Sequence, residues 1–358
     1  MKRKLLILAP YPLGEAPSQR FRFEHFLPTL DSERIEWSFQ SFYSVKGWKN
    51  LYLEGQQLKK IIAIASGYLR RFLILFNVTK YDYVLIHREL TPLGPPVFEW
   101  LIAKVLRKKI IFDFDDAIWM NDGHDSGLLW KLKWRSKIAS TCKWSWNVTA
   151  GNDFLADFAK NYCQQVVFFP TVVNTSIHQM ETRQPNPGTT QLPTIGWTGS
   201  HSTLFYLDSL LPVLQKLEQE IDFAFLVIAN KNPELPLKNF RFIKWKRETE
   251  VDDLRKMDIG VMPLEDNEWS KGKCGFKLIQ YLSIGVPAVA SPIGVNPQII
   301  RDGETGYLSN TPEEWGAYLK KLLADEVLRI QMGKKGMDLI EKEYSVNSQT
   351  EKFLSLFQ

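Results

Sequence analysis

Short, almost uninterrupted apolar runs alternate with helical stretches through most of this chain. The runs cover residues 4–10, 81–87, 109–114, 194–197, 224–229, 241–245, 259–262 and 287–291. Strands that are apolar throughout, and not only at every second position, are typical of parallel sheets covered by helices on both faces. The pattern therefore predicts an α/β fold built on parallel sheets.

A segment of different composition divides the series of strands in two. Residues 180–193, METRQPNPGTTQLP, are rich in Pro, Thr and Gly, as linkers are. We predict an N-terminal Rossmann-like domain over residues 1–172, a linker over 173–192, and a C-terminal Rossmann-like domain over 193–343. The tail, 344–358, should form a helix that packs back on the first domain. We expect the two domains to face each other across a cleft, with ligands at the carboxyl ends of the strands.

The charge and cysteine content limits the possible partners. Forty-five Lys and Arg against 40 Asp and Glu give a net charge of +5, which is too weak to indicate nucleic acid but suits an anionic ligand or membrane surface. The three cysteines, Cys142, Cys163 and Cys274, are far apart and form no CxxC pair. This spacing favours a reducing compartment without structural zinc, so we expect a cytoplasmic protein, either free or at the inner face of the membrane.

Residues 61–76 are the most apolar stretch of the chain. No stretch approaches the roughly 20 apolar residues of a spanning helix, because Arg70 and Arg71 interrupt this one. One interpretation is an amphipathic helix that covers a sheet. The other is an interfacial helix in peripheral contact with anionic lipid, which Lys59, Lys60 and Trp48 nearby would favour.

Two loops in the first half carry candidate residues for binding an acceptor. The loop after residues 4–10 contains a tight turn and then a helix start, where exposed amides, with Arg22 nearby, suit an anion or a polyhydroxyl ligand. The loop after residues 81–87 offers a histidine at the productive end of its strand, although a structural histidine is an equally simple interpretation. The candidates are Gly14, Ser18, Gln19, Arg20, His87 and Arg88.

Three carboxylates in four residues, Asp113, Asp115 and Asp116, follow the strand at residues 109–114. They repel one another, so a cation, arginines or raised pKa values must stabilise them. We predict that Asp115 or Asp116 faces the ligand as a general base or as an electrostatic partner of a developing cation. A hydrogen-bonded loop anchor is the structural alternative.

Two loops in the second half suit a phosphate. The turn after residues 194–197 combines a glycine with a helix start that offers free N–H groups. Further on, two lysines and two glycines lead into a helix over 276–284, which predicts a cationic phosphate site without a metal. Lys277 and Gln280 follow on that helix. The residues are Gly199, Ser200, His201, Ser202, Thr203, Lys273, Gly275 and Phe276.

Several of these segments together resemble a known family. GKCGFKLIQYLSIGVPAVASPIGVN at 272–296, MDIGVMPL before it and DGETGYL after it are similar to the retaining glycosyltransferases of family 4, also called group 1. The resemblance extends to FDFDDAIW at 112–119 and GWTGS at 196–200 and is weakest over residues 40–80. It implies the GT-B fold, a nucleotide diphosphate sugar as donor substrate, no cofactor and no metal.

The resemblance also implies roles for individual residues. The base would lie near Trp245 and Lys246, the ribose near Gln280, and the diphosphate at the 199–203 turn with Lys273 and Lys277. The acceptor, a glycan or lipid-linked intermediate in cell-envelope polysaccharide synthesis, would meet the first domain. The family's Glu-x7-Glu pair aligns with Gly272 and Gln280, so both glutamates are substituted here. Asp115 stands where the family often has a histidine near the reacting centre.

Three other functions remain open from the sequence. Asp113-Phe-Asp115 matches the DxD metal motif of the other glycosyltransferase fold, and manganese dependence would favour it. A sugar-nucleotide epimerase on the same scaffold would need no acceptor. A non-catalytic protein that binds sugar nucleotides or glycans would explain the missing glutamate pair.

Overall fold

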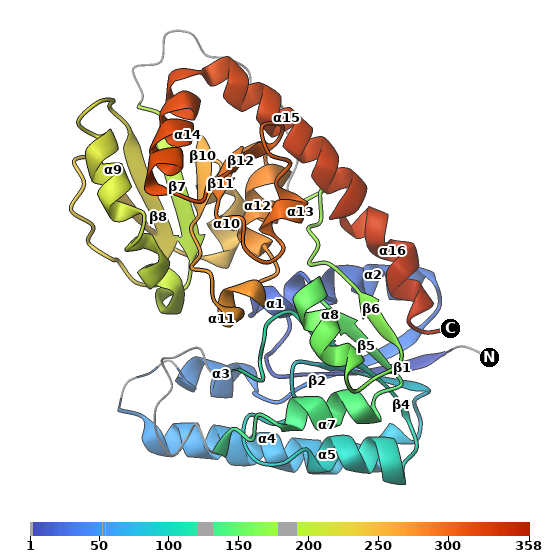
Figure 1. The fold of residues 1–358 in the computed structure, drawn as a ribbon. Coiled ribbons are helices and arrows are strands. Elements are labelled where there is room, and N and C mark those ends of the chain that lie inside the picture. Colours follow the sequence, from blue (N-terminus) through green and yellow to red (C-terminus); the bar gives the residue numbers. More distant parts are fainter. Residues whose placement is uncertain (1–2, 52, 54, 121–131, 178–191) are drawn as a thin grey trace. The chain divides into compact units, whose positions relative to one another are not determined.

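The computed structural model describes residues 3–51, 53, 55–120, 132–177 and 192–358 (Figure 1). The chain forms two compact units. Unit 1 contains Met1–Thr171, Gly272–Cys274 and Gln349–Gln358, and unit 2 contains Val172–Lys271 and Gly275–Ser348. Most of the predicted linker, residues 178–191, lies outside the described residues.

Unit 1 is built on a six-stranded sheet in which all neighbouring strands are parallel, in the order β2-β1-β3-β4-β5-β6. The apolar runs at 4–10, 81–87 and 109–114 form its central strands, as predicted, because a strand covered on both faces is buried along its whole length. The strands are β1 (Lys4–Ala9), β2 (Glu36–Ser41), β3 (Tyr83–His87), β4 (Lys109–Phe114), β5 (Asn147–Ala150) and β6 (Val166–Phe168).

The helices of unit 1 connect these strands. The longest, α4, has 22 residues, and in length and composition it is sufficient to cross a membrane. The expectation that no stretch approaches this length is therefore wrong, because polar residues at both ends extend the helix beyond the apolar run. The helices are α1 (Pro17–Arg20), η1 (Glu24–Phe26), α2 (Leu27–Ser32), α3 (Val45–Leu51), α4 (Gln57–Val78), α5 (Val97–Trp100), η2 (Leu101–Val105), α7 (Lys137–Trp144) and α8 (Asp153–Lys160).

The last helix, α16 (Val346–Ser355), ends within unit 1. The Phe353 ring stacks on Phe26 with centroids 4.4 Å apart, and Phe357 meets the edge of Tyr83 at 5.9 Å. Aromatic pairs of this kind add about 0.5–1.5 kcal/mol each beyond the area that they bury. The end of the chain therefore contributes to the core of the unit that contains its beginning.

Unit 2 is built on a second six-stranded parallel sheet, in the order β12-β11-β10-β7-β8-β9. All five predicted runs of the second half form strands. The strands are β7 (Thr194–Gly199), β8 (Ala224–Ala229), β9 (Phe240–Lys244), β10 (Ile259–Met262), β11 (Ala288–Ala290) and β12 (Gly306–Leu308).

The helices of unit 2 begin and end at recognisable signals. Pro212 splits the predicted helix, so that a 3₁₀ segment, η3, precedes α9. Thr311 and Glu314 form the predicted capping box at α14. The helices are η3 (His201–Leu207), α9 (Leu211–Leu217), η4 (Arg247–Thr249), α10 (Glu250–Leu254), α11 (Glu268–Lys271), α12 (Phe276–Ser283), α13 (Asn296–Ile299), α14 (Pro312–Ala324) and α15 (Glu326–Glu343).

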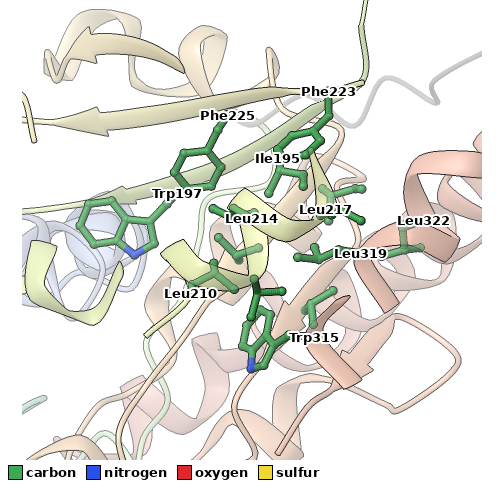
Figure 2. Packing of buried hydrophobic residues seen from close by; sticks show 14 of the residues in the cluster. Ile195, Trp197, Leu210, Leu214, Leu217, Phe223, Phe225, Trp315, Leu319 and Leu322 are labelled. Carbon is green, nitrogen blue, oxygen red and sulfur yellow. The ribbon is translucent and has the colours of Figure 1, made fainter. Parts of the chain in front are cut away.

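One face of the unit 2 sheet packs on α9 and α14. Figure 2 shows Trp197 and Phe225 from the sheet in one apolar cluster with Leu214 of α9 and Leu319 of α14. Each such buried side chain contributes about 1.5–3 kcal/mol. Since side chains alternate along a strand, Gly260 of β10 faces the other way, where a Cβ would overlap the Tyr281 ring of α12. Helix α12 therefore covers the opposite face.

Candidate functional site

Asp113, at the carboxyl end of β4, is the centre of a buried ionic cluster in unit 1. Its carboxylate accepts hydrogen bonds from the Arg22 guanidinium and, at 2.7 Å, from the Thr149 hydroxyl. It also lies 2.7 Å from His87 Nδ1. Burial would raise the pKa of Asp113, but the charge of Arg22 and the contact with His87 outweigh it and hold the pKa well below its usual range. Asp113 is therefore a structural anion.

Asp115 and Asp116, the two predicted catalytic carboxylates, share one arginine. Arg88 Nε donates to Asp115 at 2.7 Å, and Arg88 Nη2 donates to Asp116 at 2.9 Å. Burial alone would raise the pKa of Asp115, but the charge of Arg88 lowers it. Of the three possible stabilisers, arginine is the one present. A carboxylate with a lowered pKa is a weak base, so this pairing favours the electrostatic role of Asp115 over general-base catalysis.

Gly272–Cys274 group with unit 1 and extend this cluster. Lys273 Nζ lies 3.0 Å from Asp116, and the Asn152 side chain donates to the Lys273 carbonyl at 2.9 Å. Burial and the charge of Asp115 raise the pKa of Cys274 well above its usual value, so its thiol is protonated at neutral pH. Lys273, predicted as a diphosphate ligand, thus contacts a carboxylate.

His87 and Arg88 occupy the end of β3 as predicted, with different degrees of exposure. His87 is fully buried, and its Nε2 has no hydrogen-bond partner among the described residues. Arg88 adopts a positive φ of 60°, a conformation that non-glycine residues rarely adopt. This backbone turn lets His87 point into the Asp113 cluster while the Arg88 side chain reaches Asp115 and Asp116.

The first loop is folded differently from the expectation of exposed amides and arginines. Gln19 is fully buried and bonds the loop to itself, since its side-chain amide accepts from Tyr11 N at 2.8 Å and donates to Tyr11 O at 3.0 Å. Arg20 is also buried, while Gly14 turns at a φ of 81° and donates to Glu24. Helix α1 has only four residues, so it presents no anion site at its N-terminus. Only Ser18 of these candidates remains partly exposed.

A small cavity that the sequence did not indicate lies at the carboxyl ends of β1, β2 and β3. Its volume is about 210 Å³. The Tyr11 and Trp48 rings, with centroids 4.4 Å apart, line it together with Tyr43 and Glu89. The Glu89 carboxylate lies 2.7 Å from the buried Lys137 ammonium. Aromatic walls with one carboxylate suit a sugar ring or another flat, hydroxylated group.

Lys277 and Gly199 come together in unit 2, as the phosphate-site prediction requires. The Lys277 ammonium lies over the Trp197 ring, 4.1 Å from its centroid. A Cβ at Gly199 would lie 3.0 Å from Lys277 Nζ. The end of β7 is tied to α12, because Thr198 N donates to the Tyr281 hydroxyl at 3.0 Å. A fixed cation therefore lies beside the glycine turn at the carboxyl edge of the sheet.

The rest of the 199–203 turn is more exposed. Ser200, His201 and Ser202 face solvent and Thr203 is partly buried. His201 N donates to the Asn230 side chain at 2.7 Å, so this amide has a partner within the protein. The segment that follows is a seven-residue 3₁₀ helix and not the α-helix start that was predicted.

Trp245 and Gln280 also come together, through a residue that the sequence reasoning missed. Glu250, at the start of α10, accepts from Trp245 Nε1 at 3.2 Å and from Gln280 Nε2 at 3.3 Å. Glu250 and Gln280 are both buried, whereas Lys246 is exposed. Three acidic residues in the first turn of α10 were the available signal. Gly275 caps α12 at a φ of 64°, and the partly buried Phe276 is its first residue.

Within the described residues, no group of three or more His, Cys, Asp or Glu is placed to hold a metal ion. Asp113, the first carboxylate of the DxD match, is already occupied by Arg22, His87 and Thr149. Asp115 is occupied by Arg88. The two carboxylates thus serve protein cations and not a shared ligand.

Comparison with known structures places this architecture. The chain superimposes on sucrose-phosphate synthase from Thermosynechococcus elongatus with a TM-score of 0.71, 10% identity, and coverage of 99% of this chain and 98% of that one. It superimposes on a glycosyltransferase from Rickettsia africae with a TM-score of 0.65, 14% identity, and coverage of 99% and 98%. The protein has the GT-B fold. HepE of Anabaena, in complex with UDP and glucose, shares this fold at a TM-score of 0.63 and 12% identity, covering 99% of this chain and 100% of that one.

Sequence comparison adds a family match for unit 2. Residues 193–325 match the family model described as glycosyl transferases group 1. N-acetyl-alpha-D-glucosaminyl L-malate synthase of Bacillus anthracis is 24% identical over 163 residues, which are 42% of this chain and 40% of that protein. The chain therefore matches about two fifths of the length of this curated relative. The matched family region contains Gly199, Trp245, Glu250, Lys277 and Gln280.

Proposed function

We propose that this GT-B protein is a retaining glycosyltransferase that moves a sugar from a nucleotide diphosphate sugar to an acceptor hydroxyl. The observation that carries the proposal is the position of Lys277 beside Gly199, inside the region that matches the group 1 family model. A fixed cation next to a glycine turn suits a diphosphate. The proposal includes cytoplasmic work on a cell-envelope glycan or polysaccharide.

On the donor side, unit 2 supplies the groups that the leaving diphosphate needs. As the bond from the anomeric carbon to the diphosphate oxygen breaks, negative charge grows on that oxygen, and Lys277 is the residue that stabilises it. Glu250 and Gln280 suit ribose hydroxyls, and the half-buried Trp245 suits the base. The UDP in the HepE complex makes uridine the first base to test. No metal is needed when protein cations neutralise the diphosphate.

On the acceptor side, unit 1 supplies an aromatic cavity and a carboxylate pair. The cavity lined by Tyr11 and Trp48 suits a sugar ring of the acceptor. Asp115 and Asp116 stabilise the positive charge that develops on the sugar as the leaving group departs. The new bond joins the acceptor oxygen to the same anomeric carbon, and the acceptor proton leaves with the released diphosphate or solvent.

A panel of nucleotide diphosphate sugars tests this proposal. We expect one donor to raise the melting temperature, because a ligand at about 100 times its Kd stabilises the native state by about 2.7 kcal/mol. With that donor and a glycan acceptor, nucleotide diphosphate should be released at the same rate with and without EDTA. Loss of activity in EDTA and recovery with manganese would instead support metal-dependent transfer.

Two other outcomes separate the alternatives. A donor that changes its sugar configuration without any acceptor would indicate an epimerase. A donor that binds but is never consumed would indicate a non-catalytic binding protein, for which the substitution of both family glutamates by Gly272 and Gln280 is the favouring observation. Failure of every donor to bind would contradict the proposal.

A further inference from the structure

The exposed face of α4 is apolar along its length. Leu58, Ile61, Ile62, Leu69, Phe72, Leu73 and Phe76 are each between 52% and 71% exposed. They recur every three or four residues, so they form one stripe along the helix, which we call the α4 stripe. An ordinary surface helix shows polar residues on this face.

The opposite face of α4 is fixed to unit 1. Ala63, Gly67, Arg71 and Val78 are buried there, and a Cβ at Gly67 would lie 2.5 Å from the Phe42 ring. Arg71 donates to the backbone carbonyls of Leu90 at 3.0 Å and Ala9 at 2.7 Å. Both carbonyls follow or end strands of the sheet, so Arg71 holds the helix against the core of the unit and the stripe faces away from it.

The short helix α5 and its π-helical continuation η2 add to the stripe. The Tyr68 ring of α4 meets the Phe98 ring of α5 at 6.3 Å, which places the two helices together, as the blue and cyan ribbons labelled in Figure 1 suggest. Val97, Trp100 and Val105 are each 45–53% exposed. A tryptophan at the edge of an apolar patch is typical of a membrane interface.

The charges around the stripe have one sign. Residues 57–80 contain no Asp or Glu, and the one carboxylate of α5 and η2, Glu99, is buried. The exposed charged residues of α3, α4 and the α5–η2 segment are all basic: Lys46, Lys49, Lys59, Lys104 and Arg107. An apolar stripe with a basic rim is complementary to an anionic lipid surface.

The other occupants fit less well. A spanning helix would have to leave unit 1, and this would leave Arg71 and its carbonyl partners without hydrogen bonds in the bilayer. A second copy of the chain would bring two basic rims against each other. We propose that the α4 stripe and its basic rim dock unit 1 onto an anionic membrane surface, with α4 lying in the plane of the interface.

This docking goes beyond the proposed function and does not depend on it. Its consequence for the acceptor does rest on the proposed function. Trp48 and Leu51 of α3 line the aromatic cavity of unit 1, and they pack in one cluster with Ala63 and Tyr68 of α4. A docked α4 therefore brings this cavity close to the headgroups, where a lipid-linked acceptor presents its sugar.

Vesicle flotation with the full chain tests the docking, and it requires neither donor nor acceptor. We expect binding to phosphatidylcholine vesicles that contain about one third phosphatidylglycerol, and weaker binding to phosphatidylcholine alone. Leu69→Ser, Phe72→Ser and Phe76→Ser together should weaken binding at least about tenfold. Replacing Lys59 and Lys60 with glutamine should weaken it about fivefold per lysine, and only for the anionic vesicles.

A matched control removes exposed apolar residues of unit 2. Ile177→Ser with Val327→Ser, at positions 60% and 55% exposed, should leave flotation unchanged. Because the stripe residues are exposed, all variants should keep the melting temperature of the wild type. Wild-type protein that never floats with anionic vesicles would overturn the proposal. So would a dimer that the stripe variant converts to a monomer without any lipid binding, or binding that resists carbonate extraction as a spanning helix does.

Discussion

Replacing Asp113 with asparagine is expected to lower the free energy of unfolding by about 3–5 kcal/mol, because it leaves the buried Arg22 without its counter-charge. Arg22 and Asp113 are 1% and 4% exposed, so water cannot take the place of the missing partner. The same change weakens the contacts with His87 and Thr149. Urea unfolding followed by circular dichroism measures the loss.

The same carboxylate makes stability depend on pH. The folded pKa of Asp113 lies below its unfolded value of about 4, so as pH falls the unfolded chain takes up the proton first. The stabilisation by Asp113 is therefore present above about pH 4 and is lost as pH falls toward the folded pKa. In the asparagine variant this part of the acid dependence should disappear.

Asp157→Asn is the matched control. Asp157 pairs with Lys160 at 2.8 Å, but its side chain is 70% exposed. Exposed ion pairs contribute little, so no measurable change in unfolding is expected. Equal stability of Asp113→Asn and Asp157→Asn would contradict the structural role given to the β4 carboxylate.

Replacing Lys277 with alanine is expected to weaken donor binding about 100-fold and to lower kcat by a further 10²–10³-fold, the loss seen when a preorganised charge-stabilising group is removed. Lys277→Arg keeps the charge and should retain part of both. Calorimetric titration with the donor found in the panel measures binding, and nucleotide release measures kcat.

Lys271→Ala separates a local effect from a general loss of positive charge. Lys271 lies six residues upstream and pairs with Glu268 at 2.8 Å on the surface, so its removal should change neither quantity. Lys277→Ala should also keep a melting temperature close to that of the wild type without donor, since Lys277 is only half-buried. Normal donor affinity in Lys277→Ala would contradict the donor site described here.

The central strands were predictable, and several edge strands were not. Strands such as β1 and β8 are apolar at almost every position because helices cover both faces of the sheet. The edge strands β2, β6 and β12 gave no such signal. β2 reads EWSFQS and is half-buried, while β6 and β12 have three residues each. Their place in the sheet comes from pairing with a neighbour and not from their own pattern.

The candidate site was predictable in position and less so in its partners. The carboxyl ends of β4 and β7 carry Asp113 to Asp116 and Gly199, as strand-end loops should. The sequence did not show that Arg88 would bind two aspartates or that Glu250 would join Trp245 to Gln280. These contacts join segments 27 and 30 residues apart, and they depend on side-chain directions that no local pattern fixes. Gln19 was misjudged for the same reason, since its amide closes its own loop.

The stereochemistry of the transferred sugar tests the central claim most directly. The anomeric proton of the product, formed from an α-linked nucleotide diphosphate sugar and followed by NMR, reports the configuration through its coupling constant. A retaining transfer predicts an α-linked product together with one equivalent of released nucleotide diphosphate. A β-linked product, or release of the sugar to water alone when acceptor is present, would contradict the account.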